Sequence, residues 1–228
     1  MAVTPGQLPL ELAHRPALGA EDFLISQSNQ AAAAIVDRWP DWPLSSLVVV
    51  APPRAGKTHL GNVWRLKSGA ARVEACKLAE PDLPLATAKG ALLVENLQAG
   101  IADEQVLFHL LNLAREGKLS MLLTSCAAPG ELVVGLPDLR SRLRELPVVA
   151  IARPDEALLK AVLVKHFNDR QLTVEPRIVR QIALNMEQSM EAAATIVAEI
   201  DRAALAAHRK VTNQLVKQVL DRLQAAQA

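Results

Sequence analysis

Short apolar runs alternate with amphipathic stretches as far as Pro154. The apolar runs, each bounded by turn residues, predict buried strands at 47–51, 71–76, 91–96, 120–125 and 148–151. Amphipathic spacing predicts helices at 29–39, 56–66 and 103–118, two further short helices open at Pro129 and Pro137, and Pro81 and Pro84 are expected to mark a loop. Asp103 is the expected N-cap of its helix. Strands that alternate with helices in this way predict an α/β fold, a parallel sheet with helices on both faces.

The pattern changes after Pro154. Helical spacing continues through 155–171, 175–186, 189–210 and 212–224 with no strand signal, and Asp155 and Thr212 are candidate N-caps. We therefore expect three parts: an N-terminal tail at 1–22, an α/β domain at 23–153 and a small all-helical domain at 154–228.

Composition and charge exclude several classes of protein. The 228 residues carry a formal net charge of +1, so no overall field drives binding to nucleic acid or to a membrane surface. Cys76 and Cys126 lie far apart in the sequence, which is typical of a reducing compartment rather than of a disulfide scaffold. The first residues do not follow the pattern of a signal peptide, and no run approaches the ~20 apolar residues of a membrane span. We expect a cytoplasmic protein with no membrane contact.

A phosphate-binding loop is predicted where the run 47–51 meets the next helix. The sequence there is Ala51-Pro52-Pro53-Arg54-Ala55-Gly56-Lys57-Thr58. In such a loop the backbone N–H groups point inward, and the N-terminus of the helix adds its positive dipole. Lys57 would reach the β/γ-phosphates and the Thr58 hydroxyl would ligate Mg²⁺. Ala51 and Arg54 depart from the consensus, and the competing interpretation is a strand-turn-helix with a chance Gly-Lys-Thr.

Other candidate residues stand near the ends of predicted strands and in the tail. Glu95, near the end of the run 91–96, is an acid of the kind that holds Mg²⁺ in phosphate-loop proteins. Thr124 and Ser125 end the run 120–125. The tail contains one apolar cluster, Gln7-Leu8-Pro9-Leu10-Glu11-Leu12, which is either a packed arm or a docking peptide.

The order of these features resembles the AAA+ family, and in detail the branch of the bacterial replication initiator DnaA and its shorter relative Hda. The matching stretches are Asp22-Phe23-Leu24-Ile25-Ser26-Gln27-Ser28-Asn29, Gly56-Lys57-Thr58-His59-Leu60, Phe108-His109-Leu110-Leu111-Asn112, Leu122-Leu123-Thr124-Ser125 and Leu136-Pro137-Asp138-Leu139-Arg140-Ser141-Arg142-Leu143. The resemblance covers essentially the whole chain. It implies a phosphate-loop α/β domain followed by a helical lid.

The resemblance also implies roles for individual residues, with ADP or ATP and Mg²⁺ as the expected cofactors. The nucleotide would be bound by Phe23, Leu24, Ile25 and Asn29 around the adenine and by Ala51, Pro52, Pro53, Arg54, Ala55, Gly56, Lys57, Thr58 and His59. Glu95 and Asn96 take Walker B-like positions, Thr58 and Glu95 are the expected metal ligands, and Thr124 and Ser125 are sensor I-like. Arg142 matches an arginine finger that is offered in trans to the ATP of a partner.

Two expected absences and the tail favour Hda over DnaA. After the lid the sequence leaves no room for a helix-turn-helix DNA-reading domain, and no long N-terminal region precedes the α/β domain. Gln7, Leu8, Leu10 and Leu12 resemble the peptide that docks on the sliding clamp, the β subunit of DNA polymerase III. The resemblance thus implies a negative regulator of replication initiation whose partners are DnaA and the clamp, with DNA contacted only through the clamp. Whether the chain forms a homodimer stays open.

Several residues depart from the pattern of the branch. Glu95 replaces an aspartate and Asn96 replaces an acid that would position the attacking water, so hydrolysis by this chain itself should be slow or absent. Cys126 stands where DnaA has an acid. Glu191 falls where the lid would offer an arginine to the phosphates, so either the lid sits further off or the nucleotide is ADP.

Two alternative functions remain open from the sequence. One is an autonomous ATPase of the helicase-loader type, which would turn over ATP by itself through Lys57. The other is a scaffold that binds DnaA without changing its bound nucleotide.

Overall fold

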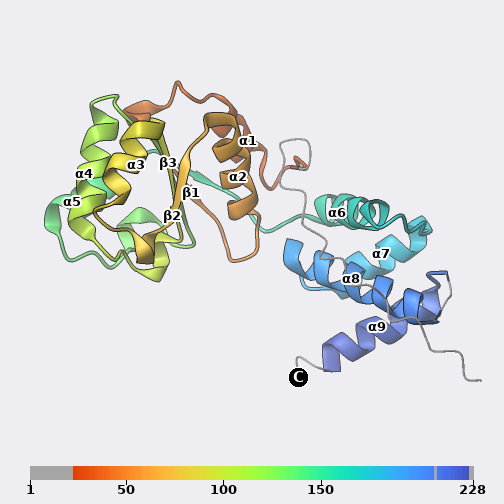
Figure 1. Cartoon of the computed structure of the whole chain (residues 1–228). Helices are drawn as coiled ribbons and strands as arrows, with labels where there is room; N and C mark the ends of the chain where they lie inside the picture. The colour runs from red at the N-terminus through yellow and green to blue at the C-terminus, as the bar shows by residue number, and fades with distance from the viewer. Residues whose placement is uncertain (1–22, 208–209, 226–228) are drawn as a thin grey trace, which may run out of the picture. The chain divides into compact units, whose positions relative to one another are not determined.

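The computed structural model describes residues 23–207 and 210–225 (Figure 1). They form two compact units that divide between Asp155 and Glu156. The first unit is a layered α/β domain and the second consists of helices. Within the described ranges no helix is both long enough and apolar enough to cross a membrane.

Five parallel strands form the sheet of the first unit. They are β1 (Ser46–Val50), β2 (Ala71–Glu74), β3 (Ala91–Glu95), β4 (Ser120–Ser125) and β5 (Val148–Ala150), in the spatial order β2-β3-β4-β1-β5. The residues of β3 are all buried and those of β1 and β4 nearly so, which is expected when both faces of a parallel sheet are covered. The predicted α/β class is confirmed. The predicted strand 71–76 is two residues too long, because residues 75–77 form a 3₁₀ turn.

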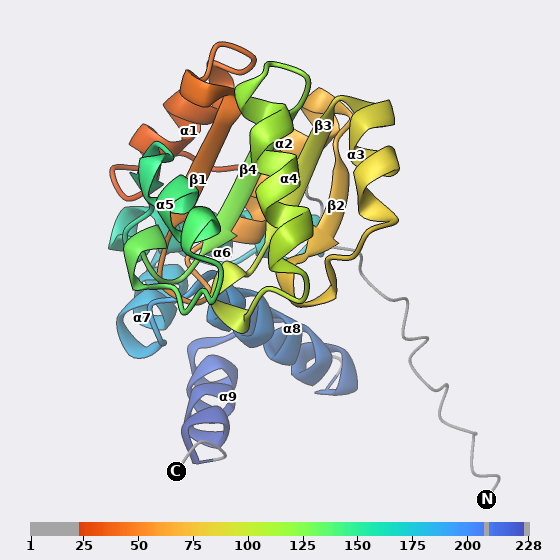
Figure 2. The same cartoon turned by 90° about the vertical axis from the view of Figure 1, so that its left-hand side faces the viewer.

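Helices cover the two faces unequally. α1 (Gln30–Asp37) and α2 (Lys57–Ser68) pack on one face, and α3 (Asp82–Lys89), α4 (Glu104–Arg115) and α5 (Pro137–Glu145) pack on the other (Figure 1), which faces the viewer in Figure 2. Short 3₁₀ turns at Pro43–Ser45, Ala75–Lys77, Leu97–Ala99 and Pro129–Glu131 complete the connections. On the α1/α2 face, Trp64 stacks on Trp42 at a centroid distance of 5.3 Å and meets Trp39 edge-on, so the tryptophans are packing residues of this core.

The prediction of a loop around Pro81 and Pro84 is wrong, because helix α3 begins directly after Pro81. Pro84 lies in the first turn, where a backbone N–H would have no partner within the helix, so the missing donor does not weaken it. Asp82 Oδ2 accepts a hydrogen bond from Ala79 N at 2.9 Å, and Gly90 ends the helix with a φ of 68°. The first turn of α3 therefore accommodates Pro84 where the sequence pattern predicted a loop.

The second unit contains α6 (Glu156–Asp169), α7 (Pro176–Asn185), α8 (Met190–Ala207) and α9 (Asn213–Ala225). The helices predicted there are confirmed. Their buried faces are built mainly from leucine, isoleucine, valine and Phe167. Thr212 Oγ1 accepts from Leu215 N at the start of α9, as expected of an N-cap, and Ser189 Oγ accepts from Ala192 N at the start of α8.

Asp103 offers a test of how the cap of α4 contributes to stability. Its Oδ1 accepts from Gln105 N at 3.0 Å and from Val106 N at 2.9 Å. We expect Asp103→Ala to lower the free energy of unfolding of the α/β unit by about 1 kcal/mol, and Asp103→Asn, which can still cap, by less. All three tryptophans lie in this unit, so urea unfolding followed by tryptophan fluorescence reports on it. Equal losses in the two variants would contradict a capping role.

Candidate functional site

The loop between β1 and α2 has the backbone geometry of an anion cradle. Ala51 N donates to Ser125 O at 3.0 Å, which fixes the start of the loop to the end of β4. Arg54 and Gly56 have φ values of 62° and 102°, and α2 begins at the next residue, Lys57. Glycine adopts the conformation at Gly56 without the strain that a side chain would bring. The turn leads directly into the N-terminus of α2, and a loop followed by a helix N-terminus is an arrangement that favours phosphate.

Lys57 is enclosed within this loop. The residue is buried, with 7% of its surface exposed. Its Nζ donates to Ala51 O at 2.8 Å, Pro52 O at 2.9 Å and Cys126 Sγ at 3.2 Å. The acceptors are neutral carbonyls and a sulfur atom, and an ammonium group binds an anionic oxygen more strongly than these. A phosphate oxygen that enters the loop can therefore replace these neutral acceptors at Lys57 Nζ with a gain in binding energy.

The carboxyl ends of β3 and β4 are tied together beside the loop. Thr124 Oγ1 accepts from Asn96 N at 3.1 Å, and Cys126 N donates to Gln98 Oε1 at 2.9 Å. Asn96 itself has a φ of 61°. These contacts join Asn96 to Thr124 and place Cys126 beside both Gln98 and Lys57.

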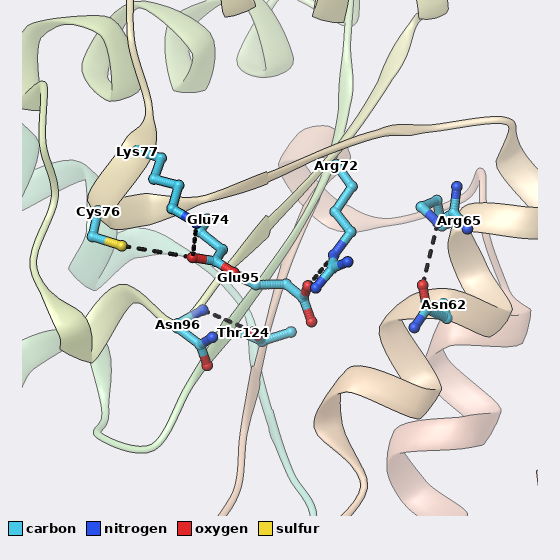
Figure 3. A network of polar contacts seen from close by, with 9 residues as sticks. All are labelled: Asn62, Arg65, Arg72, Glu74, Cys76, Lys77, Glu95, Asn96 and Thr124. Atoms are coloured by element: carbon cyan, nitrogen blue, oxygen red, sulfur yellow. Dashed lines mark hydrogen bonds and ion pairs between the residues drawn. The ribbon is translucent and has the colours of Figure 1, made fainter. Parts of the chain in front are cut away.

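Glu95 is the buried acid at the end of β3, and its partner is Arg72 on the neighbouring strand. The Arg72 Nε donates to Glu95 Oε2 (Figure 3). The register places Arg72 opposite Leu93, two residues before Glu95, so the arginine reaches along the strand. Glu95 is only 1% exposed, whereas 45% of the Arg72 side chain is exposed. Arg72 was not among the residues that the sequence pattern singled out.

The residues at this place do not fit a divalent cation. Glu95 Oε2 is engaged by a guanidinium group that already compensates its charge. Glu95 Oε1 is buried and has no hydrogen-bond partner in the part of the chain that the structure describes, and a Mg²⁺ ion that keeps several of its waters cannot reach an enclosed oxygen. Thr58, the other expected ligand, lies exposed on the first turn of α2, and one hydroxyl without an accessible carboxylate is a weak ligand set for Mg²⁺. Among the described residues no cluster of three or more His, Cys, Asp or Glu side chains could hold a metal.

The segment before α1 is closed by the side chain of Asn29. Its Oδ1 accepts from Ser26 N at 2.9 Å and its Nδ2 donates to Leu24 O at 2.9 Å. The ring of Phe23 meets the ring of His59 edge-on, with centroids 5.3 Å apart. Since His59 is the third residue of α2, this contact puts the predicted adenine-binding segment against the helix that follows the phosphate loop. Ile25 is largely exposed.

Arg142 lies away from the loop, near the C-terminal end of α5. Its Nη1 pairs with Glu145 Oε2 at 3.3 Å, and Arg115 Nη1 on α4 lies 3.8 Å from the same oxygen. The side chain is 28% exposed and lines a surface pocket of ≈ 510 Å³ together with His109, Asn112, Leu113 and Arg115 of α4 and Glu116, which follows that helix. A hydrogen bond and the charge of Lys118 hold the pKa of Glu116 below its ordinary value. Two guanidinium groups thus share the carboxylate of Glu145.

The parallel sheet separates Arg142 from the loop. The loop follows the carboxyl end of β1, whereas α5 leads into the amino end of β5 and α4 leads into the amino end of β4. The pocket therefore lies toward the opposite edge of the sheet from Lys57. Arg142 is not placed to contact an anion in the loop of its own chain.

The remaining predicted residues fall elsewhere. Glu191 is exposed in the first turn of α8. The expected clamp-binding residues Gln7, Leu8, Leu10 and Leu12 lie outside the described residues.

Comparison with solved structures identifies the fold. It is similar to domain III of the replication initiation protein DnaA from Thermotoga maritima, with a TM-score of 0.74 and 16% identity over 91% of this chain and 97% of that one. The replication initiator DnaA bound to AMPPCP and single-stranded DNA matches with a TM-score of 0.67 and 15% identity, over 90% of this chain and 80% of that one. The chain has a DnaA-like AAA+ fold.

The fold is also similar to that of a branch migration motor. The Holliday junction branch migration motor RuvB of Thermotoga maritima matches with a TM-score of 0.70 and 13% identity, over 91% of this chain and 72% of that one. No protein-family model matches the sequence. At these identities the likeness shows the fold alone.

The buried ion pair provides a test of this description of the site. We expect Arg72→Gln to lower the free energy of unfolding of the α/β unit by about 2 kcal/mol, less than the ~3–5 kcal/mol of a fully enclosed pair because water reaches much of Arg72. The double variant Arg72→Gln with Glu95→Gln should recover most of that loss, since it leaves no buried charge.

Arg65→Gln is the matched control, because Arg65 lies on α2 nearby and bonds to Asn62 rather than to Glu95 (Figure 3). Urea unfolding measures these three variants and the single variant Glu95→Gln. Additive losses from Arg72→Gln and Glu95→Gln would show that the two side chains are not coupled.

Proposed function

We propose that this chain is a nucleotide-binding AAA+ regulator that inactivates the replication initiator DnaA. In this proposal it binds ADP or ATP in its own loop, hydrolyses it slowly or not at all, and offers Arg142 to the ATP of DnaA. Hydrolysis there leaves DnaA in its ADP form and prevents a second round of initiation. The proposal places this protein in the DnaA-related Hda group of regulators.

The observation that carries the proposal is the separation of Arg142 from the chain's own loop. An arginine at the opposite edge of the sheet cannot serve a nucleotide bound beside Lys57, but it can face the nucleotide of a second molecule. A guanidinium group that meets a γ-phosphate stabilises the charge of the transition state. Arg142 would first have to leave Glu145, and an ion pair at the surface is worth no more than about 1 kcal/mol.

Nucleotide binding by this chain is supported by the form of its loop. The loop turns through positive φ values at Arg54 and Gly56 and leads into the N-terminus of α2, where the ammonium group of Lys57 is enclosed. The DnaA structure of similar fold was solved with AMPPCP bound. The contact between Phe23 and His59 brings an aromatic ring close to this loop, where an adenine base could stack.

Weak hydrolysis by the chain itself is supported by the ends of β3 and β4. Glu95 is engaged by Arg72, and the Asn96 side chain cannot accept a proton from an attacking water. The Asn96 side chain instead accepts from Gln98 Nε2 at 3.4 Å. A chain with these contacts is better suited to hold a nucleotide than to hydrolyse it.

The finger is tested by single-turnover hydrolysis of ATP bound to DnaA, in the presence of clamp loaded on DNA. We expect the wild-type chain to accelerate hydrolysis, and Arg142→Ala to lose that acceleration, a loss on the order of 10³-fold or more for an arginine finger. Arg144→Ala, an exposed arginine on the same helix, is the matched control and should keep the wild-type effect.

Other outcomes of that assay decide between the alternatives. Binding to DnaA without any acceleration by the wild-type chain would favour a scaffold. Turnover of ATP by the isolated chain that disappears in Lys57→Ala would favour an autonomous ATPase of the helicase-loader type.

Tethering to the sliding clamp is a separate part of the proposal and rests on residues 7–12. Leu8, Leu10 and Leu12 would fill an apolar groove while Gln7 supplies an orienting polar contact. We expect the clamp to retain the wild-type chain in a pull-down, and Gln7→Ala with Leu10→Ala to abolish retention. Retention that is unchanged in this double variant would refute the tether and leave the role of Arg142 unaffected.

A further inference from the structure

The charge of Glu95 is compensated within the protein, by Arg72. A carboxylate that is 1% exposed is stable as an anion only when a cation or several hydrogen bonds accompany it. The neighbouring acid on β2, Glu74, has a different partner: Lys77 lies 3.1 Å away and is the main cause of the lowered pKa of Glu74. The guanidinium group of Arg72 forms its ion pair with Glu95, as Figure 3 shows, and its charge makes a smaller contribution to the lowered pKa of Glu74.

In a phosphate-loop site that depends on metal, the acid at this strand end helps to hold a divalent cation, which compensates the phosphate charge. Here a guanidinium group already compensates this acid. We propose that this chain binds its nucleotide without a divalent cation, with Arg72 acting as the built-in counter-cation of Glu95. This inference rests on the proposed nucleotide binding and concerns the chemical form in which the nucleotide is bound.

Two features of the site disfavour the metal. For Mg²⁺ to use Glu95, the ion pair with Arg72 must break, and the remaining oxygen, Oε1, is enclosed where a hydrated ion does not reach it. Separating a buried carboxylate from its partner is costly, even when the partner is partly exposed. Mg²⁺ therefore gains little from Glu95, because the ion pair between Arg72 and Glu95 must break before the carboxylate can bind the metal.

The loop itself carries the positive charge that a metal-free phosphate group needs. Lys57 is enclosed beside the loop carbonyls, and Arg54 brings a second cationic side chain into the same short segment. Lys57 and the N-terminus of α2 can compensate part of the charge of a diphosphate.

The inference is tested by titrating the full chain with a fluorescent ADP analogue, once with EDTA and once with excess Mg²⁺. We expect the affinity of the wild-type chain to differ by no more than about twofold between the two conditions. In Arg72→Gln the carboxylate loses its counter-cation, so Mg²⁺ should raise the affinity by about tenfold or more. Arg65→Gln is the matched control and should behave as the wild type does.

A second variant keeps the test decisive if Arg72→Gln folds poorly. Arg72→Gln with Glu95→Gln removes both charges, and its affinity should again be indifferent to Mg²⁺. Thermal melting identifies the folded variants before titration. Wild-type affinity that rises tenfold with Mg²⁺ would overturn the inference, as would an Arg72→Gln variant that is folded and indifferent to Mg²⁺.

The absence of any nucleotide binding in both conditions would also overturn the inference. That result would not decide the action of Arg142 on DnaA, which the hydrolysis assay measures independently. Conversely, binding that is independent of metal would stand even if Arg142 proved inactive.

Discussion

The parallel direction of all five strands is the constraint on which the site depends. Because each strand ends at the same edge, the loop after β1, the acid at the end of β3 and the polar end of β4 come together there. Burial of both faces of the sheet leaves these strand ends as the places where polar side chains can meet. The same constraint sends Arg142 to the other edge, because α5 must return to the amino end of β5.

Charge pairing then determines which ions the groups at each end of the strands can bind. At the carboxyl edge, Lys57 is held by neutral acceptors that an anion can replace, whereas Glu95 is held by a cation that an incoming metal would have to displace. At the other edge, Arg142 and Arg115 share the carboxylate of Glu145, and Glu116 adds a second carboxylate to the pocket. The site proposed to hold a nucleotide and the arginine proposed to act on a second molecule therefore lie at opposite ends of the strands.

Much of the fold could be predicted because the hydrophobic pattern is unambiguous where both faces of an element are buried. The runs at β1, β3 and β4 are continuous because their residues face packed helices on both sides, and the Gly-Lys-Thr sequence marks the turn into α2. The pattern failed at α3, since Pro84 is compatible with a first helical turn and with a loop, and only the packing of Ala86 against the sheet distinguishes them.

The sequence by itself determined the order of the elements, the phosphate loop with Lys57, the acid at the end of β3 and the arginines of α5, since these follow from local spacing and residue type. The tertiary structure alone decided that Arg72 pairs with Glu95, that Cys126 lies beside Lys57 and that Arg142 is remote from the loop. These pairings join residues of different strands and helices. Their partners are set by the strand order and register, which no local pattern in the chain contains.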